Sequence, residues 1–565
     1  MSSLAGALLD SLRRLLPPAG SAADQALLEP VITALVAAQA QGELGLDLAG
    51  PPPEALVGVA WPQGMLEALA ATGWLLSSEE LAAASDPAAL EAPLVRDGSW
   101  LRWRRWHEQL QQCLEQLLNL AQAQPEPPMA DALLAQTRAM ASAAGLDAAQ
   151  CEAAAAVLRH RLVLLRGGPG TGKTSTVVQM LAAAVRHQPQ LQIHLAAPTG
   201  KAAARLGAAV SAGAAGLETP LAAALQALPC TTLHRLLEAR GAGRFGRHGR
   251  RPLQLDLLVV DEVSMVDLPL MQALLEALPK QARLLLVGDA DQLPPVGTGA
   301  VLAELCRPAR LQRLGPAAVE LRTTYRNNGA IADLAGCLRG ADPAQADPAE
   351  ALLPRLARLS SSDNVQWWPS DPARLPEALL DRLRQHQQRL RRLAAELSWP
   401  ADREAEPDAA SCAPLLAALE QCIALSPVRQ GRWGIDALHR ALLGPSDGVP
   451  LQRWPLGTPV LNRLNRPEQG LANGDIGVLV QRGAERWVLL EGPRLLHPSR
   501  LALAEPALAL TVHKAQGSQY NEVLLLLPPS RHQDPRLLYT GLTRARERAV
   551  LITPALTTGL PDCHD

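Results

Sequence analysis

The stretch LVLLRGGPGTGKTSTVVQML, residues 162–181, constrains the fold of this chain more than any other. An uncharged apolar run leads into a glycine-rich turn and then into residues with helical periodicity, so we predict a buried strand, a loop and a helix. The centre of the stretch, Gly167–Thr174, fits the pattern G-x-x-x-x-G-K-[ST]. Its glycines let successive backbone N–H groups curve around a phosphate, and the start of the helix adds positive potential. An ordinary glycine turn is the alternative, but the pattern is rare by chance, and we predict a nucleoside triphosphate site.

Each residue of this loop has an expected role. Lys173 would reach the β- and γ-phosphates, and the Thr174 hydroxyl would hold Mg²⁺. The residues expected to wrap the nucleotide are Gly167, Gly168, Pro169, Gly170, Thr171, Gly172, Lys173 and Thr174.

Two further strand ends carry polar side chains that suit hydrolysis. An apolar run, LLVV, is followed directly by Asp261 and Glu262. Asp261 can organise the Mg²⁺ shell together with Thr174, and Glu262 can position or deprotonate the attacking water. In LVGDADQLPPVGTG, residues 286–299, Gln292 can sense the γ-phosphate and orient water, although a polar turn stiffened by two prolines is the alternative. Paired carboxylates that follow a phosphate loop after a further stretch of alternating elements indicate a hydrolytic P-loop ATPase.

Composition limits the class of protein. With 565 residues, 48% of them apolar and 19% charged, the chain should form several globular domains. No apolar run is long enough to span a bilayer, and the N-terminus lacks the pattern of a secretory signal. The 8 cysteines are scattered, which predicts reduced thiols in the cytoplasm and neither a zinc site nor a disulfide framework. The net charge of −2 excludes a global basic field, so a polyanion would bind in a local channel or mainly on a partner.

Lysine is almost absent, because nearly every basic residue is arginine. The four lysines are Lys173, Lys201, Lys280 and Lys514. Arginine cannot imitate a compact ammonium inside a tight phosphate cradle, so a retained lysine marks a candidate functional position. Codon bias with chance survivors is the alternative, and we assign Lys280 to it. Lys201 and Lys514 are therefore candidate site residues.

The hydrophobic pattern predicts an α/β fold with several domains. Residues 1–124 are Ala/Leu-rich with helical periodicity and predict a helical N-terminal domain. Its segment SWLRWRRWHEQL alternates Trp with Arg, which favours amphipathic packing over nucleic-acid stacking, with a partner-binding surface as a third option. From 140 to 315, apolar strands alternate with helices, which is typical of a parallel sheet covered on both faces.

A second alternating region covers residues 316–450 and 508–565 and predicts a second parallel sheet. Within it, residues 340–420 are helical and rich in Pro and Asp, which predicts a surface insertion. Residues 451–507 differ from both regions, since they contain short strands with Gly/Asn turns and predict a small β-barrel.

Together these motifs resemble those of superfamily-1 helicases and, among them, the RecD family, over residues 140–565. Gln150 in LDAAQ is similar to the adenine-reading glutamine of the family. Arg326 in LRTTYR and Arg544 in TGLTRARE are similar to its two γ-phosphate arginines. The resemblance implies two RecA-like motor domains with ATP and Mg²⁺ in the cleft between them. An arginine supplied from the facing domain would make hydrolysis depend on domain closure.

The same resemblance implies 5′-to-3′ movement on single-stranded DNA lying across both motor domains. The segments APTGKAAARL, TTLHRLL and TVHKAQGSQ are similar to DNA-side motifs. Residues 451–507 would match an SH3-like insertion. The Gly/Arg-rich segment 238–252 would match the strand-splitting pin, although a floppy solvated loop is the alternative. The residues expected to contact DNA are Thr199, Lys201, His234, Phe245, His513 and Lys514.

The N-terminal run APLVRDGSWLRWRRWHEQ resembles that of RecD subunits of the RecBCD (exodeoxyribonuclease V) complex. This implies RecB-like and RecC-like partners, with the N-terminal domain docked on the latter, and a role at duplex DNA ends in double-strand break repair and recombination. A nuclease centre needs carboxylates and a lysine, and no lysine is left over for one, so nuclease activity is expected in a partner subunit. The alternatives are a stand-alone superfamily-1 helicase and a P-loop ATPase that remodels proteins.

Overall fold

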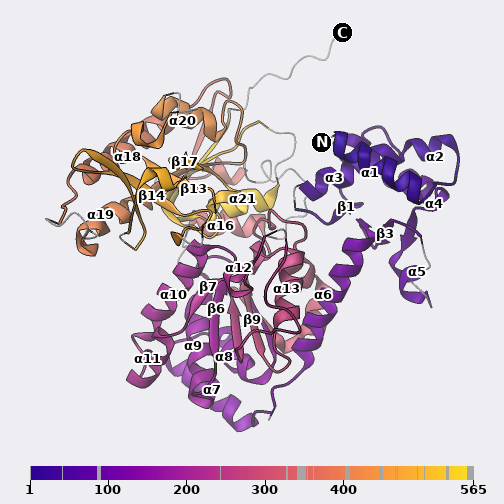
Figure 1. Cartoon of the computed structure of the whole chain (residues 1–565), viewed down its shortest axis with the longest axis horizontal. Coiled ribbons are helices and arrows are strands. Elements are labelled where there is room, and N and C mark those ends of the chain that lie inside the picture. Colours follow the sequence, from indigo (N-terminus) through magenta and orange to yellow (C-terminus); the bar gives the residue numbers. More distant parts are fainter. Residues whose placement is uncertain are drawn as a thin grey trace.

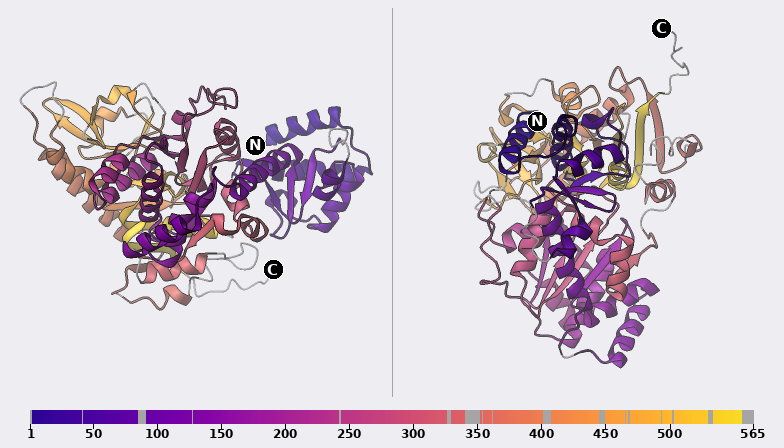
Figure 2. Two further views of the ribbon diagram at one scale, coloured as in Figure 1. Left: turned by 90° about the horizontal axis from the view of Figure 1, so that it is seen from below. Right: turned by 90° about the vertical axis from the view of Figure 1, so that its right-hand side faces the viewer.

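Three bodies follow one another along the chain in the computed structural model (Figure 1). An N-terminal body lies at one end, and two larger bodies with central parallel sheets lie beside each other, as two further views also show (Figure 2). The structure describes all residues except 1, 41, 85–90, 127, 242, 326–328, 340–351, 353, 361, 401–406, 445–448, 465, 467–468, 493, 502, 530–533 and 556–565.

The N-terminal body combines helices with a sheet that the sequence analysis missed. Its four strands lie in the order β1-β4-β3-β2. Each strand has only three or four residues, which is too short for a period-of-two pattern to stand out from the helical background. The prediction of a purely helical domain was therefore wrong in this respect. The elements are α1 (Ser2–Leu15), α2 (Ala22–Ala26), α3 (Leu28–Ala40), β1 (Gly45–Asp47), α4 (Gln63–Ala71), β2 (Leu75–Ser77), α5 (Ser78–Ala83), β3 (Leu94–Asp97) and β4 (Trp100–Trp103).

Helix α6 (Arg104–Gln122) leaves the N-terminal body and packs along the first of the two larger bodies, which correspond to the two predicted motor domains (Figure 1). Its apolar face, which includes Leu110, Leu114 and Leu117, is buried in one of the two cores of that domain. The predicted boundary at residue 124 is therefore too late, because α6 shares the core of the motor domain. Trp106 packs against the same core, which agrees with the amphipathic interpretation of the Trp/Arg segment.

The first motor domain is built on a parallel sheet of six strands in the order β10-β5-β9-β8-β6-β7. Side chains of β5 alternate between its two faces. Leu162 and Leu164 enter one core with α6 and α13, and Val163 and Leu165 enter the other with α8 and α9. The strands are β5 (Leu162–Gly167), β6 (Ile193–Ala197), β7 (Cys230–Thr232), β8 (Leu257–Val260), β9 (Arg283–Gly288) and β10 (Ala318–Leu321).

The helices of this domain that the structure describes follow the pattern expected for a sheet covered on both faces. They are α7 (Asp131–Ala143), α8 (Ala148–Arg159), α9 (Lys173–His187), α10 (Gly200–Ala214), α11 (Thr219–Gln226), α12 (Leu233–Leu236), α13 (Leu268–Ala277), α14 (Val301–Leu305) and α15 (Pro308–Leu314).

Strand β10 corrects the predicted start of the second motor domain at residue 316. It pairs in parallel with β5, so that Leu321 lies opposite Gly167, and it forms the edge of the first sheet. The sequence shows an apolar strand at this point but not its partner, since strand pairing is a long-range choice. The first motor domain therefore extends at least to residue 321.

The second motor domain has a parallel sheet of five strands in the order β11-β20-β19-β12-β18. Two cores again cover its faces, one with α16 and α21 and the other with α18 and α20. Strand β11 lies within the predicted insertion 340–420, so the described part of that region contributes an edge strand to the sheet. The elements are α16 (Ala330–Leu338), β11 (Val365–Ser370), α18 (Glu377–Ala395), α19 (Ala409–Leu419), β12 (Cys422–Ser426), α20 (Ile435–Leu443), β18 (Ala509–Thr511), β19 (Tyr520–Leu526), α21 (Pro535–Leu542) and β20 (Ala545–Pro554).

An antiparallel sheet in the order β16-β15-β14-β13-β17 occupies the region where a small barrel was predicted. One face encloses its own core around Leu479 and Val488, and Val478 and Val480 on the other face pack against α18 and α19. An insertion of short strands is thus present, while its relation to SH3 barrels stays a prediction. The strands are β13 (Pro459–Asn462), β14 (Ile476–Arg482), β15 (Glu485–Leu490), β16 (Arg494–Leu496) and β17 (Ala504–Pro506).

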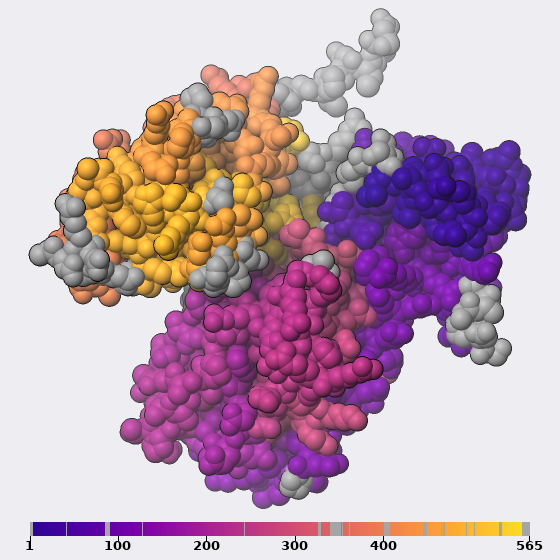
Figure 3. Space-filling model, in the orientation of Figure 1, coloured from indigo at the N-terminus to yellow at the C-terminus, as the bar shows by residue number. Residues whose placement is uncertain are grey.

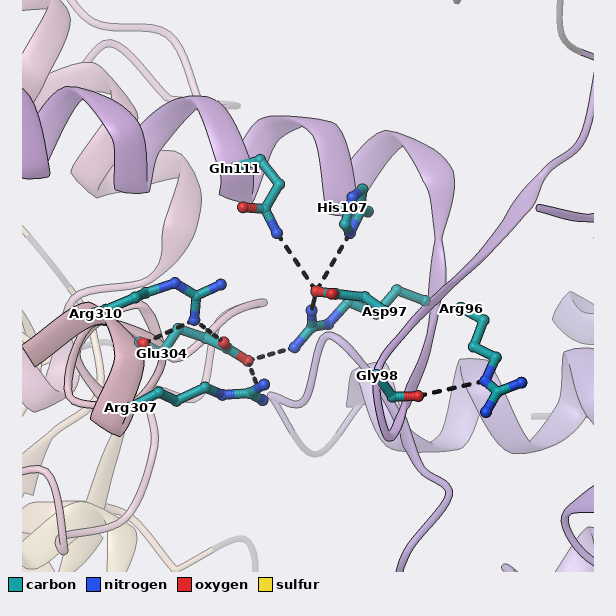
Figure 4. Close-up of polar contacts among 9 residues, drawn as sticks. Arg96, Asp97, Gly98, His107, Gln111, Glu304, Arg307 and Arg310 are labelled. Atoms are coloured by element: carbon teal, nitrogen blue, oxygen red, sulfur yellow. Dashed lines mark hydrogen bonds and ion pairs between the residues drawn. The ribbon is translucent and has the colours of Figure 1, made fainter. Parts of the chain in front are cut away.

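A buried ion-pair network joins the N-terminal body to the first motor domain (Figure 4). Arg102 on β4 has no exposed surface and binds Asp97 and Glu304, the latter on α14. Arg307 and Arg310 each lie 2.8 Å from the Glu304 carboxylate. Removing one partner of a buried pair leaves the other charge uncompensated and typically costs about 3–5 kcal/mol. This network therefore fixes the two bodies to each other.

The N-terminal body also reaches both sides of the boundary between the motor domains. The N–H of Gly299 donates to the Gly42 carbonyl over 3.0 Å, and the Gly42 backbone lies against Pro295. The neighbouring Glu43 forms a 2.8 Å ion pair with Arg536 on α21 of the second motor domain. One short segment thus contacts the loop after β9 and a helix of the facing domain.

Within the described residues, we find no helix with both the length and the apolar character needed to cross a membrane.

Candidate nucleotide site at the boundary between the motor domains

The glycine loop connects β5 to α9 as predicted. Gly170 and Gly172 have φ angles of 78° and 79°, which an L-amino acid with a side chain rarely adopts. The Lys173 ammonium donates to the carbonyls of Gly167 and Gly168 over 2.7 and 2.9 Å. An ammonium has three N–H donors, so one remains available to a phosphate oxygen. The turned backbone and the positioned lysine fit a triphosphate.

The strand order brings the predicted polar residues to the same edge of the sheet. Strands β5, β9 and β8 are neighbours, and carboxyl ends of parallel strands lie at one edge. The glycine loop follows β5, Asp289 follows β9, and Asp261 and Glu262 follow β8. Residues that are far apart in the sequence therefore meet around Lys173.

The surroundings of Asp261 raise the pKa of its carboxyl group. Burial and the adjacent Glu262 carboxylate raise the pKa of Asp261 to about 6, although Lys173 and Arg205 act in the opposite direction. Its Oδ1 accepts a 2.9 Å hydrogen bond from the Glu262 N–H, and Glu262 has a φ of 53°. A left-handed φ at a non-glycine residue is a strained conformation that often occurs at functional sites.

A magnesium ion fits the donor set of Thr174 and Asp261. Mg²⁺ commonly uses one or two protein oxygens together with phosphates and waters. No cluster of three or more His, Cys, Asp or Glu ligands occurs in the described part of the chain. A cation beside Asp261 would also counter the burial that disfavours its charged form.

Gln292 is buried beside Asp289 and has one unused polar atom. Its Nε2 donates to Asp289 Oδ2 over 3.2 Å, whereas its Oε1 is buried without a hydrogen-bond partner. A buried acceptor without a partner is costly unless a ligand or water supplies a donor. This carbonyl oxygen is therefore suited to accept a hydrogen bond from a water molecule.

Gln150 and Tyr325 lie beside the glycine loop on the side of Gly172. Gln150 forms a capping box with Asp147 at the start of α8, and its Nε2 is close to Gly172. The Tyr325 hydroxyl donates to Asp147 over 2.9 Å, and the Tyr325 N–H donates to the Gly170 carbonyl over 2.8 Å. The Tyr325 ring is 52% exposed, so one face can stack on a planar base. The sequence analysis missed Tyr325, although an aromatic residue next to the predicted Arg326 was a usable signal.

The second motor domain faces this site with Arg544 and Tyr539. Arg544 is buried, and its guanidinium donates to the carbonyls of Thr540 and Ser518 over 3.1 and 3.2 Å. Burial lowers the pKa of Arg544, and the facing Glu262 carboxylate opposes this effect. Tyr539 donates to Asp289 Oδ2 over 2.8 Å. The predicted Arg326 lies outside the described residues.

Hydrogen bonds cross the boundary between the motor domains, which are in direct contact (Figure 3). The Thr540 hydroxyl accepts from the Leu293 N–H over 2.9 Å, and Gln516 donates to the Leu293 carbonyl over 3.0 Å. Nearby, Arg205 of α10 donates to the Gly517 carbonyl over 2.6 Å. Two segments predicted to face DNA, from different domains, are thus brought together.

Three of the predicted DNA contacts lie near this junction. Thr199 caps α10 by accepting from the Ala202 N–H over 3.2 Å, which is a structural role for its hydroxyl. Lys201 lies 5.6 Å from the centre of the Tyr520 ring, in a cation–π contact between the two domains. His513 is at the start of a short 3₁₀ helix, and burial lowers its pKa.

Lys514 is paired with a carboxylate instead of pointing freely to solvent. It forms an ion pair with the buried Glu505 of β17. Arg429 and Arg463 approach the same carboxylate to 2.8 and 3.7 Å. Three cations around one carboxylate leave an excess of positive charge, so the cluster as a whole can still attract phosphate.

The segment 238–252 is an ordered turn structure, apart from residue 242, which is not described. Bridges join Ala239 to Phe245 and His248 to Arg251, and Glu238 forms ion pairs with Arg247 and Arg251. These contacts contradict the floppy-loop alternative.

His234 and Phe245 lie together at the base of this segment, with ring centres 6.4 Å apart. Phe245 is half-buried and packs against the core of the first motor domain. Phe245 was predicted to contact DNA because it is the only phenylalanine of the chain and lies in a pin-like segment. Its ring also packs against the core, and the contact with DNA stays a prediction.

Comparison with known proteins decides the family. The family model described as "AAA domain" matches residues 150–298, and the one described as "UvrD-like helicase C-terminal domain" matches residues 506–552. The "RecBCD enzyme subunit RecD" of Mycolicibacterium smegmatis is 37% identical over 487 residues, which cover 83% of this chain and 81% of the relative. The chain belongs to the RecD family. It is accordingly a superfamily-1 helicase, a DNA-dependent ATPase that binds nucleotide.

A second relative and a solved structure each match a smaller part of this RecD-family chain. The "ATP-dependent RecD2 DNA helicase" of Deinococcus radiodurans is 33% identical over 417 residues, covering 72% of this chain and 48% of that helicase. A solved structure of two coordinating Pif1 helicases at forked DNA has 18% identity and a TM-score of 0.37, with 70% of this chain and 88% of that chain covered.

Proposed function

We propose that this chain is the ATP-driven motor subunit of a RecBCD-type helicase–nuclease. It would act in the cytoplasm on DNA ends during double-strand break repair and recombination. The observation that carries this proposal is the boundary between the motor domains. Asp289 and Glu262 of the first motor domain face Tyr539 and Arg544 of the second, so that hydrolysis and relative motion of the domains would share one set of residues.

The residues of the first motor domain bind ATP and activate water in this proposal. Lys173 and the loop amides hold the phosphates, and Gln150 and Tyr325 lie where the base would be. Thr174 and Asp261 would hold Mg²⁺, which neutralises charge on the phosphates. Glu262 takes a proton from the attacking water, and Gln292 Oε1 accepts a hydrogen bond that orients it.

The second motor domain completes the site when the cleft closes. Arg544, together with Arg326, would stabilise the charge that develops on the γ-phosphate. The carbonyls of Thr540 and Ser518 hold the Arg544 guanidinium. The Thr540 hydroxyl and Gly517, the residue before Ser518, also bind the first domain. The position of Arg544 is therefore tied to how the second domain sits on the first. Release of phosphate would then let the domains separate again.

DNA would bind across the junction of the motor domains. Lys201 and His513 lie there, and the cations around Glu505 lie on the second domain. Contacts with backbone phosphates hold a strand without reading its sequence, as a translocating motor requires. We propose 5′-to-3′ movement on the basis of the family resemblance.

RecB-like and RecC-like subunits are the proposed partners, with the N-terminal body as the docking unit. The name of the mycobacterial relative supports this assembly. The relative from Deinococcus radiodurans, whose name is that of a DNA helicase alone, supports a second candidate, a motor that works alone.

Unwinding of tailed duplexes tests the proposal and separates the two candidates. The chain, alone and with co-expressed RecB-like and RecC-like chains, is given duplexes with 5′ or 3′ tails and ATP. We expect unwinding from the 5′ tail, an ATPase rate that rises steeply with single-stranded DNA, and co-elution of the three chains. A fully processive monomer would overturn the subunit assignment, and an ATPase indifferent to DNA would overturn the motor.

A further inference from the structure

Arg339 of the second motor domain reaches across the domain boundary to the glycine loop. It follows α16 directly, and its guanidinium Nη2 lies against Gly168, so closely that a side chain at residue 168 would collide with it. Its Nε forms a 3.2 Å ion pair with Asp291, which follows β9 of the first domain. The sequence analysis did not identify this residue.

The charge around Arg339 matches a position at the phosphates. Its guanidinium faces the Tyr539 hydroxyl, Asp289 and Asp291. Burial opposes its charge, but these three oxygen-bearing groups outweigh burial and raise the pKa of Arg339. The arginine thus stays charged while its side chain is only 28% exposed.

Three contacts place this guanidinium at the γ-phosphate end of the loop. The Gly168 carbonyl accepts from Lys173, the residue that reaches the β- and γ-phosphates. Asp289, which faces Arg339, binds both Gln292 and Tyr539. The base end of the loop, marked by Gly172 and Gln150, lies at its other end.

On the basis of the ATP site proposed above, we propose that Arg339 is a further catalytic residue. It would leave Asp291 and bind a γ-phosphate oxygen when ATP occupies the cleft. In hydrolysis the water oxygen bonds to Pγ while the bond from Pγ to the bridging oxygen breaks, and ADP leaves with that electron pair. The water proton passes to Glu262, and Arg339 keeps its protons and stabilises the charge on the transferred group.

A simpler role is that of a latch, in which the pair of Arg339 and Asp291 only holds the two domains together. The two roles differ in what they recognise. A γ-phosphate ligand distinguishes ATP from ADP, whereas a latch affects both nucleotides equally. Asp291→Asn removes the latch and leaves the guanidinium in place.

The experiment compares Arg339→Gln, Arg339→Lys and Asp291→Asn in the full chain. Arg382→Gln is the matched control, because Arg382 pairs through Nε with a buried carboxylate, Glu522, over 2.7 Å on a distant part of the second domain. The measurements are the DNA-stimulated ATPase rate and the affinities for ADP and for a non-hydrolysable ATP analogue. Melting temperatures show whether each variant is folded.

We expect Arg339→Gln to lower the maximal ATPase rate by about 1,000-fold or more, within the range known for arginine fingers. The affinity for the ATP analogue should fall about tenfold with that for ADP unchanged, and Arg339→Lys should restore part of the analogue affinity. Equal losses for both nucleotides, or the same losses in Asp291→Asn, would overturn the inference in favour of a latch. If Lys173→Gln also retained normal turnover, the proposed ATP site itself would be wrong, so the two failures are distinguishable.

Discussion

The two motor domains have the same architecture and opposite chemistry. Each has an all-parallel sheet with a core on either face. The first places a glycine loop and the carboxylates Asp261, Glu262 and Asp289 at the edge of its sheet, whereas the second faces them with Arg339 and Arg544. A shared fold therefore does not give a shared task. We infer that one domain binds the nucleotide and the other responds to it.

The largest effect should come from the binding half of the cleft. Lys173→Gln removes the ammonium that the carbonyls of Gly167 and Gly168 position, and we expect ATP hydrolysis to be abolished. The fold should be unchanged, because only the phosphate cradle loses a contact. Steady-state ATPase assays and melting curves measure the two outcomes. Near-normal turnover would remove the distinction between the domains.

The next effect should come from the responding half. Arg544→Lys keeps a charge but loses the planar fork, and we expect hydrolysis to fall by about 100-fold or more. Binding of ATP should change little, because the loop lies in the other domain. Single-turnover hydrolysis and nucleotide titration separate the two quantities, with Arg382→Lys as the control. A parallel loss of binding would contradict the division of tasks.

A smaller effect is expected on DNA. Lys514→Ala should weaken binding of single-stranded DNA about tenfold and lower the slope of log K against log salt by about one. Basal ATPase should be kept, since Lys514 pairs with Glu505 and not with a residue of the nucleotide site. Lys280→Ala, at a lysine with no assigned role, is the control. An unchanged salt slope would count against the contact.

The last effect concerns the pH dependence of stability and returns to the first domain. Asp261 has a pKa of about 6 in the folded protein, above the ordinary value of 3.8. Protonation therefore favours the folded state, and this stabilisation is full below the unfolded pKa and is lost as pH rises through about 6. Asp261→Asn lacks this loss, so without nucleotide it should gain about 2 kcal/mol relative to the parent chain between pH 4 and 7.5. Unfolding midpoints at both pH values test this, and parallel pH profiles would contradict it.

Short-range patterns predicted which residues of the first domain come together around the glycine loop, while their roles stay predictions. The glycine loop, Asp261 and Gln292 lie at strand ends that are contiguous apolar runs, and parallel pairing then brings them together without further information. The choice of partner strand was not predictable in this way. Strand β10 pairs with the first sheet, and α6 packs in the core of the first domain. The sequence did not predict either choice, because the apolar face of each element could pack against several neighbours.

Residues whose role depends on a neighbour from another domain were the hardest to predict. Arg339 has no motif of its own, and only its contact with Gly168 marks it. The sequence shows Tyr325 next to Arg326, but its position beside the glycine loop is apparent only in the structure. Phe245 shows the reverse difficulty, since its rarity suggested a function while its packing against the core appears only in the structure.

The buried Arg102 network has a mechanical consequence. It fixes the N-terminal body to α14 of the first motor domain. A partner that binds the N-terminal body would therefore also hold the first motor domain still. The stroke then belongs to the second domain, whose described tie to the N-terminal body is the Glu43–Arg536 pair. That ion pair joins the part that stays fixed to the part that moves, so the distance between Glu43 and Arg536 should change in each cycle of the motor.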